Sequence, residues 1–167
     1  ADSLKRDATT IGYVDADGAT ATEYFYDLIT QMGEFDGCIA SRYMKGSVVT
    51  PPRPLIKRWG SKLVYETLVL LLFQLNYHDL QCGAKVFKRA VIEKVTPHLS
   101  VTQWAFDVQL LYLCRRFGFK IKEIPTVWHD QAGSKLALFG GGMKMLKALI
   151  MLRFEYVLRR KNHHKKN

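Results

Sequence analysis

The sequence has few cysteines and no long uncharged hydrophobic run. Its three cysteines, Cys38, Cys82 and Cys114, stand far apart and form no CxxC or Cys/His pattern, which argues against a zinc site or a disulfide framework. We interpret them as reduced, mostly buried thiols in a cytosolic setting. No uncharged run reaches 18 residues, and no secretory signal is visible, so the sequence predicts no transmembrane helix. The nearest candidate, residues 63–75, contains Glu66, which favours a buried or interfacial helix.

Acidic residues are also scarce at the carboxyl-terminal end. The chain carries 25 Lys and Arg against 15 Asp and Glu, a formal net charge of +10. Residues 131–167 hold nine basic residues and one acid, Glu155, so that nine minus one, or +8, of this charge lies there. Such asymmetry is typical of a basic segment that meets an anionic surface, either lipid or nucleic acid.

What the sequence does contain predicts an α/β domain. A chain of 167 residues, 48% of them hydrophobic, is expected to form one domain with a proper core. Short apolar runs alternate with helical patterns, which favours a mostly parallel sheet with helices on both faces. We predict strands at 9–14, 37–41, 84–87 and 120–128, helices at 22–32, 56–75, 89–95, 104–117 and 138–160, and a site-covering loop at 45–54.

Two carboxylates follow the first predicted strand. The apolar run 10–14 ends at Asp15-Ala16-Asp17-Gly18. Ligands of parallel α/β sheets bind just beyond the carboxyl ends of the strands, and two acids there can hold one hard divalent cation. The same pattern is also typical of a simple acidic turn or cap, so the pair alone leaves both interpretations open.

Five short segments then occur in order along the chain, and together they resemble one family. They are Val-Asp-Ala-Asp-Gly-Ala-Thr at 14–20, Ala-Ser-Arg-Tyr at 40–43, Asp-Leu-Gln-Cys-Gly-Ala-Lys-Val-Phe at 79–87, Trp-Ala-Phe-Asp-Val-Gln-Leu-Leu at 104–111 and Gly-Ser-Lys-Leu at 133–136. Over residues 3–154 they look like the inverting family 2 glycosyltransferases that act on polyprenyl phosphates. The likeness is greatest to dolichyl-phosphate β-glucosyltransferases, with dolichyl-phosphate mannose synthases next. The family's first half, which holds the nucleoside base, has no counterpart in this chain.

The resemblance implies a Rossmann-like GT-A fold, of which this chain holds the carboxyl-terminal portion. It implies inverting transfer of a hexose, glucose before mannose, from a nucleotide diphosphate sugar to a polyprenyl phosphate. UDP-glucose is the favoured donor and GDP-mannose the next. A Mg²⁺ or Mn²⁺ ion on Asp15 and Asp17 would stabilise the diphosphate leaving group. Some mannose synthases carry a further ligand where this chain has Ala19, which favours the glucosyltransferases.

The same resemblance implies roles for residues beyond the two acids. Asp79, Asp107 and Arg42 are expected around the sugar and the phosphates, with Asp79 positioning the sugar because an acceptor phosphate is already a nucleophile. A turn cap at Asp79 and a structural ion pair at Asp107 remain alternatives. The other candidates are Gly83, Ser134 and Lys135 for donor phosphates, Arg42, Lys57, Arg58 and Ser61 for the acceptor phosphate, and His129 as a further metal ligand.

We divide the chain into a catalytic portion, 1–136, and a membrane-proximal helix with a basic tail, 137–167. The last helix offers apolar residues that include Leu149, Ile150 and Phe154 for one side. An amphipathic helix followed by a basic tail predicts binding to an anionic membrane surface, here on the cytoplasmic face. A helix that closes the core of the domain is the alternative.

Three other functions remain in view. A related transferase that builds a polysaccharide would need a firm general base at Asp79. A non-catalytic fragment would fit the missing first half. A nucleic-acid binding module would use the basic tail, but no known reader pattern accompanies it, so nucleic acid is not an expected partner.

Overall fold

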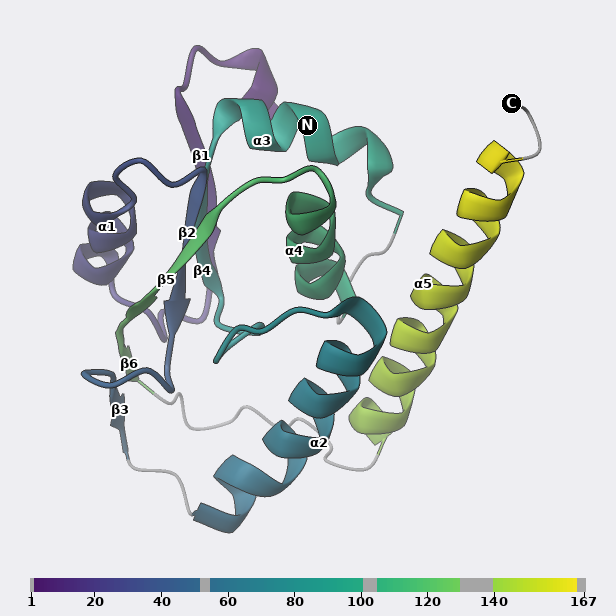
Figure 1. The fold of residues 1–167 in the computed structure, drawn as a ribbon. Helices are drawn as coiled ribbons and strands as arrows, with labels where there is room; N and C mark the ends of the chain where they lie inside the picture. Colours follow the sequence, from purple (N-terminus) through teal and green to yellow (C-terminus); the bar gives the residue numbers. More distant parts are fainter. Residues whose placement is uncertain (1, 52–54, 101–104, 130–139, 165–167) are drawn as a thin grey trace.

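A four-stranded sheet forms the centre of the molecule, with α1 on one face and α4 on the other (Figure 1). The computed structural model describes residues 2–51, 55–100, 105–129 and 140–164. In chain order the elements are η1 (Asp2–Lys5), β1 (Thr10–Val14), α1 (Thr22–Gln31), β2 (Gly37–Ser41), β3 (Val48–Thr50), α2 (Leu55–Phe73), β4 (Ala84–Lys88), α3 (Arg89–Val95), η2 (Thr96–His98), α4 (Phe106–Arg116), β5 (Ile121–Pro125), β6 (Val127–His129) and α5 (Gly140–His164).

The sheet is mixed, which corrects the prediction of a mostly parallel one. Its strand order is β1-β4-β2-β5, and β4 runs antiparallel to both β1 and β2, while β2 and β5 are parallel. An apolar run buried on both faces has the same composition in either direction, so its pattern could not reveal this reversal. The α/β class and the helices on both faces are confirmed, and the arrangement is consistent with a GT-A glycosyltransferase domain.

The strand predicted over residues 120–128 is two strands in two sheets. β5 ends at Pro125, which lies opposite Ser41, and β6 begins two residues later and pairs in parallel with β3. Thr126 joins the sheets, because its N–H donates to the Ser41 carbonyl at 3.2 Å and its carbonyl accepts from Val48 at 3.0 Å. Since proline has no N–H to donate, the chain leaves the larger sheet here. β3 itself lies inside the predicted loop.

Side chains that alternate along the strands pack into two hydrophobic clusters. Ile39 belongs to the larger cluster together with residues of α2, α3, α4 and α5, whereas its neighbours Cys38 and Ala40 belong to the smaller cluster with Leu28 of α1. Successive strand residues point to opposite faces, so each face has its own core. All three cysteines are buried free thiols, as predicted.

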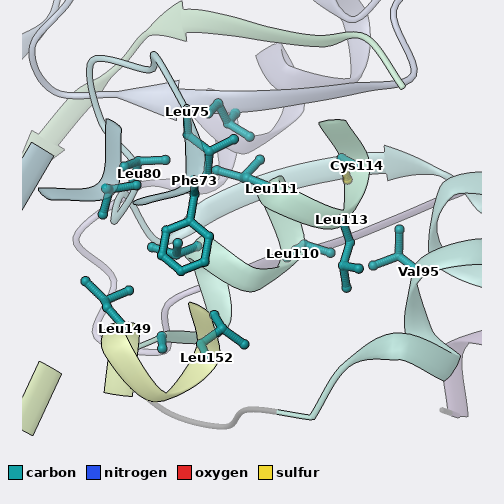
Figure 2. Close-up of a cluster of buried hydrophobic side chains, with 14 of the residues drawn as sticks. Phe73, Leu75, Leu80, Val95, Leu110, Leu111, Leu113, Cys114, Leu149 and Leu152 are labelled. Carbon is teal, nitrogen blue, oxygen red and sulfur yellow. The ribbon is translucent and has the colours of Figure 1, made fainter. Parts of the chain in front are cut away.

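Helix α5 contributes to the larger core. Leu149 and Leu152 extend from α5 towards Phe73 of α2 (Figure 2), and the two leucines are 0% and 1% exposed. The predicted apolar side was therefore wrong in part, because Leu149 faces the core while Ile150 and Phe154 are exposed. No helix in the described part of the chain is long and apolar enough to cross a membrane. The division at residue 137 lies among residues 130–139, outside the described part, and stays a prediction.

Candidate functional site

The turns that follow β1 and precede β4 lie side by side at one edge of the sheet. Val14, the last residue of β1, is paired with Ala84, the first residue of β4, because the two strands are antiparallel. The N–H of Asp15 donates to the carbonyl of Gly83 at 2.8 Å, which extends this pairing by one step. The reversal of β4 thus brings the segment 79–83 to the carboxyl end of β1.

The carboxylate of Asp15 lies against the backbone of Gly83. A Cβ atom on Gly83 would come within 1.9 Å of Asp15 Oδ2, so any side chain there would displace this carboxylate. Gly83 was expected near the donor phosphates, and the structure gives it a specific reason to be glycine. The pKa of Asp15 is raised, mainly by partial desolvation of its carboxylate and to a lesser extent by repulsion from Asp17 and Asp107. Asp15 is nevertheless exposed to solvent.

Asp17 lies in the turn after β1, where one of its oxygens is used locally. Its Oδ1 accepts a hydrogen bond from the N–H of Ala19 at 2.9 Å, which is the turn role left open by the sequence. The carbonyl of Ala19 accepts from the N–H of His129 at 2.8 Å. The exposed end of β6 is therefore adjacent to the acidic turn, and the backbone of His129 lies beside it.

Arg42 and Asp79 form an ion pair at the end of β2. Arg42 Nε donates to Asp79 Oδ2 at 2.7 Å and Nη2 donates to Oδ1 at 2.9 Å. The backbone N–H groups of Arg42 and Gln81 donate to the same carboxylate at 3.0 and 3.2 Å. The guanidinium also lies over the Trp128 ring, 5.3 Å from its centroid. These contacts hold the planar guanidinium in one orientation.

This pairing involves the acid that was expected to position the sugar. Its carboxylate is 2% exposed, and the backbone N–H of Asp79 is in turn held by Glu123 Oε1 at 2.8 Å. Burial alone would raise the pKa of Asp79, but the charge and hydrogen bonds of Arg42 hold that pKa below its ordinary value. A carboxylate with four donors and a lowered pKa is poorly suited to act as a base or to bind a sugar hydroxyl. In this structure Asp79 is the ion-pair partner of Arg42.

Asp107 is bound to two residues that sequence reasoning missed. Its Oδ1 accepts from Lys85 Nζ at 2.7 Å and from the Tyr13 hydroxyl at 2.5 Å. Burial and the neighbouring Asp107 carboxylate raise the pKa of Tyr13, so the phenol stays protonated and donates. A lysine within the apolar strand 84–87 was the signal that could have pointed to this pair, since lysine is rarely buried without a partner.

Among the residues that the structure describes, several charged side chains gather at this edge of the sheet. Four charged groups act on the pKa of Asp15: Asp17 and Asp107 raise it, and Lys85 and Arg42 lower it. Asp79 lies at the same place, because it forms an ion pair with Arg42. Carboxylates outnumber cations among these described side chains. The oxygen donors and this excess of carboxylates fit a divalent cation of the Mg²⁺ or Mn²⁺ kind, with Asp15 and Asp17 as the exposed acids. Within the described ranges, no group of three or more His, Cys, Asp or Glu side chains forms a preassembled metal site.

Several sequence-predicted positions lie where the structure says nothing of their side chains. Ser134 and Lys135 belong to residues 130–139, outside the described part. Lys57, Arg58 and Ser61 are in the first turns of α2, whose backbone alone is described. Their assignments to donor and acceptor phosphates stay predictions.

Known proteins that match this chain are glycosyltransferases. No family model matches the chain. It is 43% identical over 94 residues to the dolichyl-phosphate β-glucosyltransferase of Saccharomyces cerevisiae, covering 56% of this chain and 28% of the relative. It is 30% identical over 154 residues to the enzyme of the same name from Dictyostelium discoideum, covering 87% and 46%. Glycosyltransferase AglD of Haloferax volcanii is 31% identical over 144 residues, covering 83% and 23%.

The chain thus spans less than half the length of these relatives. Most of its own length is nevertheless covered, and the first two relatives carry the name that the five motifs predict. The resemblance to the polyprenyl-phosphate glycosyltransferases is confirmed, and this chain is similar in sequence to a part of the dolichyl-phosphate β-glucosyltransferases.

Proposed function

We propose that this chain is the part of a glycosyltransferase that holds the diphosphate end of a nucleotide sugar and transfers its hexose to dolichyl phosphate. The observation that carries the proposal is the convergence of Asp15, Asp17, Asp107 and Arg42 at one edge of the sheet in a homologue of dolichyl-phosphate β-glucosyltransferases. Glucose is the proposed sugar, in line with the names of the relatives, and UDP-glucose is the donor that we propose for it. Mannose from GDP-mannose is the second candidate.

The proposed reaction forms one bond and breaks another at the anomeric carbon of the sugar. An oxygen of the lipid phosphate attacks this carbon while its bond to the nucleoside diphosphate breaks. The diphosphate leaves with the bonding electron pair, and attack from the opposite side inverts the anomeric configuration. Because the phosphate acceptor is already anionic, the step needs positive charge and orientation more than it needs a base. The ion pair between Asp79 and Arg42 supports a proposal in which Asp79 is not the base.

The side chains of this site suit those two tasks. Arg42 is held in one orientation by Asp79 and Trp128, and its Nη1 group makes no hydrogen bond with the described residues, so it can donate to a phosphate oxygen. Asp15 and Asp17 would hold a Mg²⁺ or Mn²⁺ ion, which supplies charge to stabilise the departing diphosphate. Lys135, Lys57, Arg58 and Ser61 stay candidates for the remaining phosphate contacts.

We further propose that helices α2 and α5 face the membrane that carries the lipid substrate. The two helices lie side by side away from the sheet (Figure 1). Large apolar side chains are exposed on each, Leu71 by 73% on α2 and Phe154 by 63% on α5. Lys144 and Lys147 are exposed on α5, and the basic tail follows it. Apolar side chains next to clustered lysines favour an anionic lipid surface, and the cytoplasmic face is the proposed one.

A transfer assay tests the proposal directly. Radiolabelled UDP-glucose and GDP-mannose are each incubated with the protein and dolichyl phosphate, with and without EDTA, and lipid-bound sugar is counted. We expect transfer from UDP-glucose that exceeds transfer from GDP-mannose and falls to background in EDTA. Transfer that resists EDTA would contradict the metal, and transfer only to a growing sugar chain would favour the polysaccharide-building alternative.

A further inference from the structure

Lys85 occupies the middle of β4 with its side chain 0% exposed. Its ammonium group donates to Asp107 Oδ1 at 2.7 Å and to the carbonyl of Cys82 at 2.6 Å. The same ammonium group lies 5.6 Å from the centroid of the Tyr13 ring. Tyr13 is the residue of β1 that pairs with Lys85. The cation is therefore held by α4 through Asp107, by the turn before β4 through Cys82, and by β1 through Tyr13.

Stability alone gives a weak reason for this arrangement. Burying an ammonium and fixing its long side chain costs free energy, and a buried ion pair is often no more stable than apolar residues of the same volume. Phe87, two residues along β4, and Ile39, which pairs with Lys85 from β2, both belong to the larger hydrophobic cluster, so an apolar residue would suit this face of the strand. A lysine at this place points to a task for its charge.

The charge of Lys85 reaches the acids of the site. It pairs with Asp107 directly, and its attraction lowers the pKa of Asp15 and of Asp79 against the desolvation that raises both. Lys85 is thus the direct counter-ion of Asp107, and it also bonds to Cys82 in the turn that follows Asp79. Unlike Arg42, it has no exposed surface with which to touch a substrate.

The two hydrogen bonds that described residues donate to Asp107 meet on one of its oxygens. Lys85 and Tyr13 both donate to Oδ1, whereas Oδ2 accepts no hydrogen bond from the residues that the structure describes. Asp107 is 25% exposed in its side chain, so Oδ2 is open to a ligand beside Asp15. Ionised carboxylates accept strong hydrogen bonds from hydroxyl groups, which are the groups that a sugar carries.

We propose that Lys85 is a positioning residue that, with Tyr13, fixes Asp107 through Oδ1 so that Oδ2 accepts a hydrogen bond from one hydroxyl of the transferred sugar. The inference rests on the proposed function, because it takes the ligand at this edge to be the sugar of the donor. It makes Asp107 the residue that selects the sugar, a task that Asp79 cannot perform while Arg42 holds it. Lys85 contacts no substrate and acts through Asp107.

The test pairs protein variants with donors that lack single hydroxyls. Initial rates are measured for the wild type, Lys85→Met, Asp107→Asn and the control Lys88→Met, with UDP-glucose and its 2-, 3-, 4- and 6-deoxy analogues. The control changes a half-exposed lysine of the same strand, away from Asp107. We expect one deoxy donor to lower kcat/KM of the wild type and of Lys88→Met at least about tenfold. For Lys85→Met and for Asp107→Asn, the kcat/KM values with that deoxy donor and with UDP-glucose should differ by less than about threefold. The KM for dolichyl phosphate should be unchanged.

Two results separate this inference from the proposed function. A Lys85→Met protein that discriminates against the deoxy donor as the wild type does overturns the positioning role, even though transfer itself is intact. A wild type that transfers no sugar from any of these donors overturns the proposed function, and the sugar assigned to Asp107 with it. If Lys85→Met fails to fold, Tyr13→Phe removes the other hydrogen bond to Oδ1 and should weaken the same discrimination. Wild-type discrimination in a folded Tyr13→Phe would then contradict the inference.

Discussion

At the scale of single residues, the contact between Asp15 and Gly83 predicts a substitution that lowers activity with little loss of stability. In Gly83→Ala the new methyl group would stand 1.9 Å from Asp15 Oδ2 and must push this exposed carboxylate aside. We expect kcat/KM for transfer to fall at least about tenfold, because a small displacement of a catalytic group is costly. The free energy of unfolding should change by less than about 1 kcal/mol, since only the mobile end of a side chain has to shift.

Gly33 provides the matched comparison. Its φ is +55°, a backbone conformation that side chains disfavour, and a Cβ there would meet nothing within 4 Å. Gly33→Ala should therefore lower the free energy of unfolding by about 1 kcal/mol and leave transfer unchanged. Equal effects of the two substitutions on both measurements would show that Gly83 has no special relation to the site.

The Arg42–Asp79 ion pair predicts a pH-dependent contribution to stability. Asp79→Asn leaves the guanidinium of Arg42 buried without its counter-ion, which should lower the free energy of unfolding at pH 7 by about 3 kcal/mol. The folded state holds the pKa of Asp79 below its unfolded value, so the wild type has this stability above about pH 4 and loses it as the pH falls through the lowered pKa. The difference in the free energy of unfolding between Asp79→Asn and the wild type should therefore shrink as the pH falls.

Denaturant unfolding between pH 2 and 7 measures this effect. Glu93→Gln is the control, because Glu93 is 51% exposed and pairs with Arg89 on the surface of α3. Exposed pairs contribute little, so this variant should stay within about 0.5 kcal/mol of the wild type. An Asp79→Asn protein whose deficit is the same at every pH would contradict the ion-pair account.

The sequence could predict the acids of the site, but it could not predict their partners. Asp15 and Asp17 were recognisable because they directly follow an apolar strand. Arg42 and Asp79 are 37 residues apart in the chain, and their pairing depends on the direction of β4. The position of Lys85 beneath Asp107 depends in addition on how α4 packs against that strand. Such contacts are properties of the tertiary structure, which periodicity and residue type do not encode locally.

At the scale of whole elements, α2 has one face in the core and another in contact with solvent. Phe73 is 2% exposed and packs in the larger cluster, whereas Leu71 on the same helix is 73% exposed. Phe73→Ala should lower the free energy of unfolding by about 4 kcal/mol through a cavity, and Leu71→Ala should change it by less than about 0.5 kcal/mol. Denaturant unfolding of both variants checks this difference. Similar losses would contradict the assigned orientation of the helix.

The exposed apolar side chains of α5 predict membrane binding without a role in folding. Met151 and Phe154 are 61% and 63% exposed. Their joint replacement by serine should weaken binding to vesicles that contain phosphatidylserine at least about fivefold and leave the melting temperature unchanged. Val48→Ser on β3 is the control, since Val48 is 50% exposed on an element that does not take part in the proposed surface. Unaltered sedimentation of the double variant with vesicles would contradict the lipid-facing role.

Helices and strands were predictable where hydrophobic periodicity was long or clear. The strand at 37–41 and the helix at 89–95 have the bounds that the sequence predicts. β3 was missed because three residues between a glycine and two prolines leave no periodic signal. The division between β5 and β6 was missed because both strands continue one alternating pattern, and the change of sheet at Thr126 is set by hydrogen bonds to β2 and β3 rather than by that pattern.

At the scale of the whole molecule, charge is separated in a way that fits the two anionic substrates of the proposed reaction. Carboxylates outnumber cations among the described side chains at the sheet edge, while +8 of the net charge of +10 lies in residues 131–167. A divalent cation suits the first region and an anionic lipid surface suits the second. The chain covers less than half of its named relatives, so this division of charge describes the part of the protein that is present here.

The acidic turn after β1 is proposed to act on the departing diphosphate, and one substitution tests this role most directly. Asp17→Asn keeps the shape of the side chain and an oxygen for the bond from Ala19, but it removes the charge. In this variant the initial rate of glucose transfer from UDP-glucose to dolichyl phosphate should fall at least about 100-fold, with an unchanged melting temperature. The control Asp7→Asn changes an exposed acid before β1 and should keep the wild-type rate. An Asp17→Asn protein that transfers glucose at the wild-type rate would contradict the claim.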